Sequence, residues 1–173
     1  MNRSKLETLL LTLESTPALL ARAIREFSPR EATRRPAAGG FSLVENVWHL
    51  ADLEREGYGV RIRRLLTEEE PTLSNFDGDR LARERDYQGR SLAEGLAAFS
   101  LARHRNLERL RAVPSAAWNR AGFQESVGRI LLADVPRLMA EHDRSHTEDI
   151  RALLSEVRSG TPLPNPRPTS AVA

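Results

Sequence analysis

Apolar residues recur every three or four positions along four long stretches of the chain, the period of an α-helix that buries one face. The pattern predicts helices over about residues 4–27, 42–66, 91–112 and 132–158. Start signals agree, because Ser42 and Ser91 are each followed three residues later by a glutamate, which is the arrangement of a capping box. Thr16-Pro17 interrupts the first stretch, so we expect that helix to kink or restart there.

The segments between these helices predict connections, and the period-two alternation typical of strands appears nowhere. Residues 67–89 contain proline, glycine and scattered Asp and Asn, which indicates one long connection that also covers the mouth of a site. Residues 121–128 are expected to be a loop. The predicted fold class is therefore all-α, a four-helix bundle with a long crossover connection between the second and third helices.

The length of 173 residues fits one domain. We predict a helical-bundle domain over residues 1–158 and a proline-rich, extended tail over residues 159–173. No apolar run approaches the roughly 18 residues that a membrane span needs. The first residues also lack the apolar core of a signal peptide, so we expect a cytoplasmic protein with no membrane partner.

Charge and cysteine content exclude several classes of function. The formal net charge is only +2, and the arginines are interleaved with acidic residues rather than gathered with aromatics in one stripe. This distribution argues against a nucleic-acid partner. Because the chain has no cysteine, it forms no disulfide, no thiolate metal site and no thiol nucleophile. Any thiol chemistry needs an external thiol.

Three of the four histidines lie where a helical bundle buries its side chains. His142 and His146 are four residues apart on the apolar stripe of the last predicted helix, so their rings point together into the interior. His49 lies in the most apolar run of the chain, where a buried imidazole needs a partner. We therefore predict one metal ion held by His49, His142 and His146. The alternative is three ordinary histidines, and His104 lies among charged residues on a solvated face.

The spacing does not choose the metal, since imidazole binds several divalent ions. We expect zinc or nickel first, with iron or manganese as alternatives. Three protein ligands leave one coordination position open, which is typical of catalytic rather than structural sites.

Three carboxylates near the histidines are candidate catalytic residues that steer a proton: Asp52, Glu45 and Asp143. Each has a simpler interpretation. Glu45 completes the helix cap, and Asp52 and Asp143 fit exposed charges. Arg55, near the expected mouth of the site, is a candidate to hold a substrate carboxylate.

The order of motifs resembles the DinB-like superfamily, a family named after a damage-inducible protein that includes bacillithiol transferases and mycothiol-dependent enzymes. The resemblance spans about residues 4–156. It rests on residues 36–42, 47–54, 75–77, 117–122, Gly128 and 139–146. The resemblance implies a four-helix bundle, a divalent metal on His49, His142 and His146, and a homodimer.

Two hypotheses about function follow. In the first, the chain is a metal-dependent enzyme in which a three-histidine metal activates water or a low-molecular-weight thiol, giving a hydrolase or a thiol S-transferase that acts on an electrophilic small molecule. In the second, it is a non-catalytic metal-binding or stress-related scaffold protein, in which the metal joins two helices.

Overall fold

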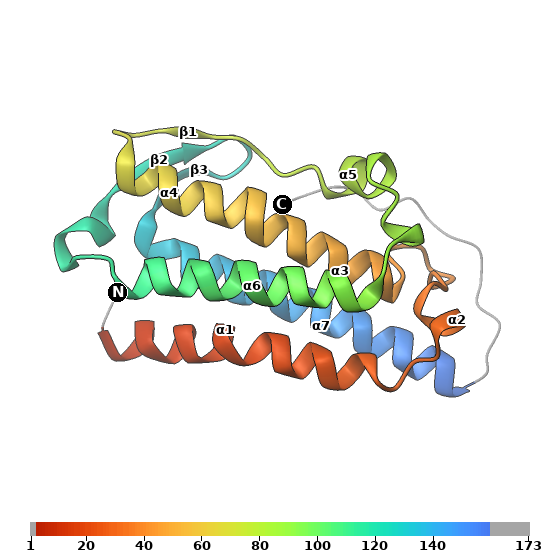
Figure 1. Cartoon of the computed structure of the whole chain (residues 1–173). Coiled ribbons are helices and arrows are strands. Elements are labelled where there is room, and N and C mark those ends of the chain that lie inside the picture. Colours follow the sequence, from red (N-terminus) through yellow and green to blue (C-terminus); the bar gives the residue numbers. More distant parts are fainter. Residues whose placement is uncertain (1–2, 160–173) are drawn as a thin grey trace.

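In the computed structural model, which describes residues 3–159, four long helical segments lie side by side (Figure 1). They are α1 (Arg3–Ile24), α3 (Leu43–Asp52) with its continuation α4 (Gly59–Thr67), α6 (Leu92–Arg111) and α7 (Val135–Ser159). A π-helical turn, η1 (Leu53–Tyr58), joins α3 to α4 without a break. The predicted all-α four-helix bundle is confirmed, and its second to fourth helices end within a few residues of the predicted limits.

The connections contain short helical pieces. These are α2 (Pro29–Ala32), α5 (Gly78–Glu84) and the 3-10 turns η2 (Tyr87–Gly89), η3 (Ser115–Asn119) and η4 (Leu132–Asp134). Ser42 caps α3 as predicted, because its hydroxyl accepts a hydrogen bond from the Glu45 amide and the Glu45 carboxylate accepts one from the Ser42 amide.

The helices are not arranged in simple sequence order around the bundle. Both α1 and α3 contact α6 and α7, so α1 and α3 occupy opposite corners. The α3–α4 segment and α6 run in the same direction (Figure 1). The chain must therefore return along the bundle between them, which is why the predicted crossover connection is long. The crossover carries α5 and η2.

A small sheet at one end of the bundle was not predicted. Strand β2 (Ala121–Gln124) pairs in parallel with β1 (Thr72–Leu73) and antiparallel with β3 (Gly128–Leu131). The expectations that residues 121–128 form a loop and that the chain has no strand are therefore wrong. Strands of two to four residues are too short for alternation to be readable in the sequence.

Helix α1 continues through Pro17, so of the two expected outcomes, a kink or a restart, the restart is wrong. Proline has no amide hydrogen, so the carbonyl of Leu13, one turn earlier, lacks its helical partner. Nη1 of Arg103 on α6 donates to this carbonyl oxygen at 3.0 Å. A buried side chain from another helix thus satisfies the acceptor that the proline leaves free, and the helix continues.

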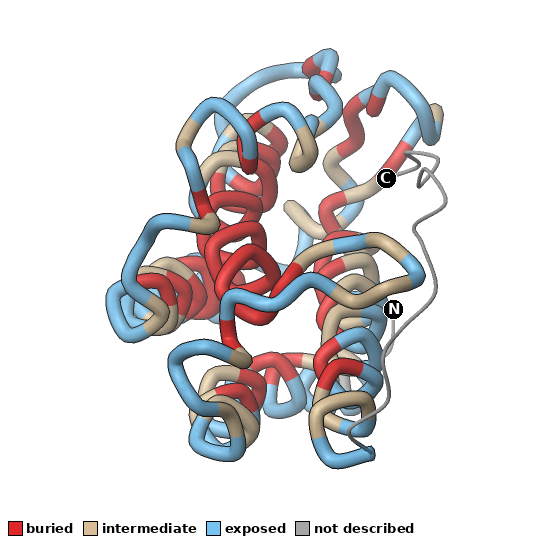
Figure 2. The backbone as a smooth tube through the Cα atoms, turned by 90° about the vertical axis from the view of Figure 1, so that its right-hand side faces the viewer, coloured by how far each residue is buried: buried red, intermediate tan, exposed pale blue. Residues whose placement is uncertain are grey.

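The core consists of two hydrophobic clusters with a polar layer between them. The first cluster includes Trp48, Tyr87 and Phe99, and the second includes Leu13, Ile62 and Met139. On α7, Met139 and Ile150 belong to different clusters, and residues 142–146 lie between them. Figure 2 shows the buried positions on the faces that the helices turn toward one another. His142, Asp143 and His146 lie on this part of α7, and Arg103 of α6 reaches Asp143 there.

The predicted tail, residues 159–173, lies outside the described residues except for Ser159, which ends α7. Within residues 3–159, no helix combines the length and the apolar character that crossing a membrane requires.

Candidate metal centre

His49 from α3 and His142 and His146 from α7 meet between the helices. The Nε2 atoms of His49 and His146 each lie 3.2 Å from Nε2 of His142. The three potential ligand atoms all fall within 4.8 Å of one another, and among the described residues no fourth His, Asp or Glu joins them. The structure thus brings together the three histidines that the sequence selected and leaves His104, whose side chain is 66% exposed, beside Glu108 on the surface.

The spacing of the nitrogen atoms fits a metal ion. Zinc–nitrogen bonds of about 2.0–2.1 Å in a tetrahedral site place neighbouring nitrogens about 3.3 Å apart. The two measured separations of 3.2 Å match this value. A divalent ion between the three rings would accept a lone pair from each Nε2 atom, so the arrangement suits a metal ion.

Asn46, one turn before His49 on α3, fixes the tautomer of His146. The Asn46 side-chain amide donates to the carbonyls of Phe41 and Ser42 at 3.1 and 3.0 Å, which turns its oxygen toward His146. That oxygen lies 2.7 Å from Nδ1 of His146. An amide oxygen only accepts hydrogen bonds, so Nδ1 carries the proton and Nε2 presents a lone pair to the centre. Metal-binding histidines usually have such an outer partner.

All three histidines are held in the neutral form that binds metals. Burial lowers the pKa of His49 to about 3, with a further contribution from the charge of His146. Burial and the neighbouring histidines lower the pKa of His142 to about 2. Burial lowers the pKa of His146 to about 4, and Asp143 opposes this shift. Protons therefore do not compete for these nitrogens at neutral pH.

Aromatic side chains line the centre. The rings of Phe41 and Phe76 lie 5.3 and 5.7 Å from the His49 ring, and the Tyr58 ring lies 6.2 Å from that of His142. The backbone at Gly78, the first residue of α5, packs so closely on His49 that a β-carbon would overlap the ring. The crossover connection thus covers His49, while the His146 side chain remains 13% exposed.

Glu45 does not contact a histidine. Its carboxylate accepts hydrogen bonds from the Ser42 amide and from the Arg35 guanidinium. Burial raises the pKa of Glu45, but the bonds from Arg35 and Ser42 outweigh burial and hold the pKa below its usual value. The Glu45 carboxylate therefore forms the helix cap and an ion pair with Arg35.

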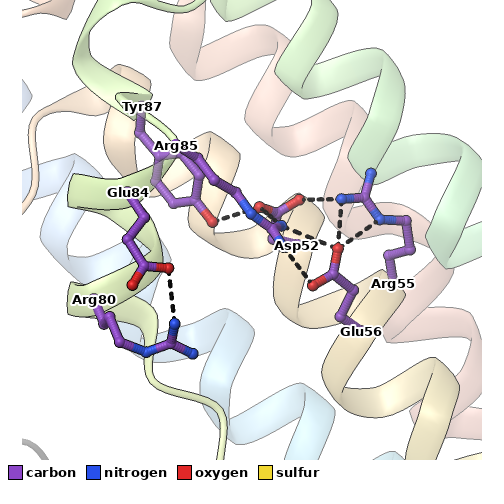
Figure 3. A network of polar contacts seen from close by, with 7 residues as sticks. All are labelled: Asp52, Arg55, Glu56, Arg80, Glu84, Arg85 and Tyr87. Atoms are coloured by element: carbon purple, nitrogen blue, oxygen red, sulfur yellow. Dashed lines mark hydrogen bonds and ion pairs between the residues drawn. The ribbon is translucent and has the colours of Figure 1, made fainter.

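Asp52 is fully buried, so the interpretation as an exposed charge is wrong. Figure 3 shows its carboxylate between Arg55 on η1 and two residues of the crossover, Arg85 and Tyr87. Arg55 donates to it at 2.7 Å and Tyr87 at 2.5 Å, and Arg85 also pairs with Glu56 at 2.8 Å. This network attaches the crossover to the helix that carries His49.

Asp143 is also buried, at 6% exposure, so the exposed interpretation is wrong here too. Its carboxylate binds Arg103, whose two Nη atoms donate to it at 2.7 and 2.8 Å. Arg103 further donates to Glu54 at 2.9 Å. Burial opposes the charge of Arg103, but Glu54 and Asp143 outweigh it and raise the pKa. The Thr16 hydroxyl completes the group by donating to Asp143 at 2.8 Å.

Sequence reasoning missed Asn46, Arg103 and Glu54. Asn46 had a readable signal, because a polar residue in the most apolar run of the chain is buried and needs partners. Arg103 had none, since one arginine among many in this chain looks like part of a solvated face.

Comparisons with known proteins agree with the bundle and its order of motifs. The family model of the DinB superfamily matches residues 12–150. Curated protein sequences give no match. A similar solved structure is that of YfiT from Bacillus subtilis, described as a probable metal-dependent hydrolase with an unusual four-helix bundle topology. Its TM-score is 0.84 at 23% identity, over 94% of this chain and 91% of that chain. The chain belongs to the DinB superfamily.

Proposed function

We propose that the protein is a metal-dependent hydrolase that acts on a small electrophilic molecule at the three-histidine centre. One observation carries this proposal: three neutral imidazoles direct their Nε2 atoms to one point, with no fourth protein ligand among the described residues. Three ligands with an open position are typical of catalytic sites. The description of YfiT as a probable metal-dependent hydrolase supports the same class of reaction.

A divalent ion in this site supplies Lewis acidity and lowers the pKa of a water or thiol in the open position. The chain's own residues prepare the site for that ion. Asn46 holds His146 in the tautomer that leaves Nε2 free. Phe41 and Phe76 exclude water around His49. Burial raises the pKa of Tyr58, whose hydroxyl donates to the Leu138 carbonyl at 3.1 Å, so this phenol stays protonated.

The thiol S-transferase is the second candidate, because a divalent ion held by His49, His142 and His146 would also lower the pKa of an external thiol. The third candidate is a scaffold in which the ion joins α3 to α7 without catalysis. The ion is zinc or nickel in our proposal, with iron or manganese as alternatives.

The proton-steering role of Glu45, Asp52 and Asp143 stays a prediction. Their partners favour positioning of the helices that carry the histidines. Asp143 is the one of the three whose charge acts on a histidine pKa, that of His146. We also propose a cytoplasmic homodimer, and light scattering of the purified protein measures the stoichiometry.

The test begins with metal analysis of protein purified without a histidine tag. We expect about one ion per chain in the wild type and none in His142→Ala, while His104→Ala keeps its metal because that side chain lies on the surface. A His142→Ala variant that retains stoichiometric metal would refute the three-histidine site.

The reaction is then tested on loaded protein with activated esters, and in parallel with a small thiol and an electrophile. Metal-dependent ester cleavage without a thiol supports the hydrolase. Turnover only with the thiol supports the transferase, and metal binding without either activity supports the scaffold.

A further inference from the structure

Arg61 on α4 is a buried cation that no carboxylate accompanies among the described residues. Its residue exposure is 7%, and among the described residues it forms no hydrogen bond or ion pair. Its Nε atom is fully enclosed and unsatisfied. Burial lowers the pKa of Arg61, yet a guanidinium keeps its charge in proteins. An unpaired buried charge is costly, and proteins usually compensate it with an anion.

Arg61 lines a pocket of about 110 Å³ between η1, α4 and the start of the crossover, together with Ser74, Asn75 and Phe76. The other charges in the wall are already engaged. Arg64 pairs with Glu68 at 2.6 Å, and Glu56 accepts from Arg85 at 2.8 Å. Arg61 is therefore the one charge of this pocket that lacks a counter-ion among the described residues.

Neutral donors complete the wall. The side-chain oxygen of Asn75 accepts from the Ser126 hydroxyl at 2.8 Å, which leaves the Asn75 amide nitrogen as a donor. Ser74 supplies a hydroxyl. A guanidinium with adjacent amide and hydroxyl donors recognises a compact oxyanion, because every group can donate to its oxygen atoms.

The pocket adjoins the three-histidine centre. Phe76 lines the pocket and lies edge-on to the His49 ring at 5.7 Å. On the other side, the Arg61 guanidinium lies 5.4 Å from the centre of the Tyr58 ring, which in turn contacts His142. The charge of Arg61 also contributes to the low pKa of His142. The pocket and the three-histidine centre therefore share Phe76 as a common wall.

We propose that Arg61, Ser74 and Asn75 form a subsite for a carboxylate or phosphate group of the molecule processed at the three-histidine centre. Binding of the oxyanion follows from the pocket alone. Its assignment to the substrate rests on the proposed function. Arg55, the arginine that the sequence favoured for this role, is instead paired with Asp52 and Glu56.

The experiment measures thermal unfolding of the full chain with acetate, inorganic phosphate or chloride at equal ionic strength, with zinc and with a chelator. At about ten times its Kd, the preferred oxyanion raises the Tm of the wild type by about 3–6 °C over chloride in both metal states. Arg61→Met abolishes this shift. Arg61→Lys keeps the charge but not the planar fork, so it shows a smaller shift.

Arg63→Met is the matched control, since this neighbouring arginine is exposed and lies outside the pocket. It retains the full shift. An equal shift in the wild type and Arg61→Met overturns the subsite, and so does a shift that disappears with the chelator, because the anion then binds the metal. If the protein binds no metal but the Arg61-dependent shift persists, the proposed function fails and the subsite stands. The stronger of the acetate and phosphate shifts identifies the group.

Discussion

Replacing Asn46 by alanine removes the outer partner of His146 and tests the metal centre most directly. The Asn46 oxygen lies 2.7 Å from Nδ1 of His146, and its amide donates to the Phe41 and Ser42 carbonyls. Without this side chain the imidazole is free to place its proton on Nε2, the atom that faces the other two histidines. We therefore expect Asn46→Ala to weaken metal binding while all three histidines remain.

The magnitude follows from the burial of these groups. Loss of an outer-shell partner lowers metal affinity by about 10–100-fold, which corresponds to about 1.4–2.7 kcal/mol. Asn46 is only 1% exposed, so water does not readily replace it. Each buried polar group left without a partner lowers the free energy of unfolding by a further ~1–3 kcal/mol. Nδ1 of His146 and the Phe41 carbonyl lose this partner, whereas the Ser42 carbonyl still accepts from the Asn46 backbone amide at 2.9 Å.

Competition titration against a zinc chelator measures the affinity, and urea unfolding of the metal-free protein measures the stability. Two variants separate the effects. Asn46→Asp keeps an oxygen acceptor for His146 but loses both donors, so it loses stability and keeps at least wild-type affinity. Asn106→Ala removes a buried amide that donates to Glu54 at 2.8 and 2.9 Å and contacts no histidine. The Asn106→Ala variant should therefore lose stability but keep the wild-type zinc affinity. Wild-type zinc affinity in folded Asn46→Ala would refute the argument that Asn46 prepares His146 as a ligand.

Three further predictions concern stability and the crossover. Asp143→Ala leaves Arg103 with one fewer counter-charge in the core, so urea unfolding should show a loss of about 3–5 kcal/mol, and a loss below about 1 kcal/mol would contradict the buried pair. In metal-free protein the three histidines have lowered pKa values in the folded state. Below about pH 6.5 the unfolded chain therefore binds more protons than the folded chain. The contribution of the histidines to the free energy of unfolding should therefore reach its full value above about pH 6.5. It should fall toward pH 4 by up to about 1.4 kcal/mol per pH unit for each histidine, whereas a flat profile would argue against burial of the three histidines. Gly78→Ala should displace either α5 or the His49 ring and weaken zinc binding about tenfold in the same chelator titration, so an unchanged Kd would exclude close packing of the crossover on His49.

The sequence predicted the helices and the His142–His146 pair because both depend on local spacing, and it indicated His49 through the apolar run that surrounds it. Residues four apart on a helix share a face, which places His142 and His146 together without knowledge of the rest of the fold. The same helical spacing predicts that Asp143 is buried, because this residue lies four positions after Met139 and three before His146 on one stripe of the helix. The exposed interpretation rested instead on the single helical step that separates Asp143 from His142. The error came from considering His142 alone, because Met139 and His146 place Asp143 on the buried side of α7.

What the sequence did not predict depends on contacts between distant residues. The short strands β1 and β2 pair residues about fifty positions apart, which no local pattern encodes. The partner that Arg103 finds at Leu13 depends on the loss of one amide hydrogen at Pro17 and on the packing of α6 against α1. The π-helical turn likewise depends on distant contacts, since Asn106 of α6 donates to the Glu54 carbonyl within it.

These distant contacts explain how the three histidines are kept in register. Arg103 joins α1, η1 and α7 through Leu13, Glu54 and Asp143. A buried ion pair adds little net stability over well-packed apolar residues, so its value lies elsewhere. If α7 slid by one turn along the bundle, Arg103 would lose Asp143 and keep only Glu54 as a counter-charge, a loss of about 3–5 kcal/mol. The same slide would move His142 and His146 about 5.4 Å past His49. Arg103 and its counter-charges thus penalise the displacement that would separate the three histidines, so the alignment of the candidate metal centre depends on the buried ion pairs beside it.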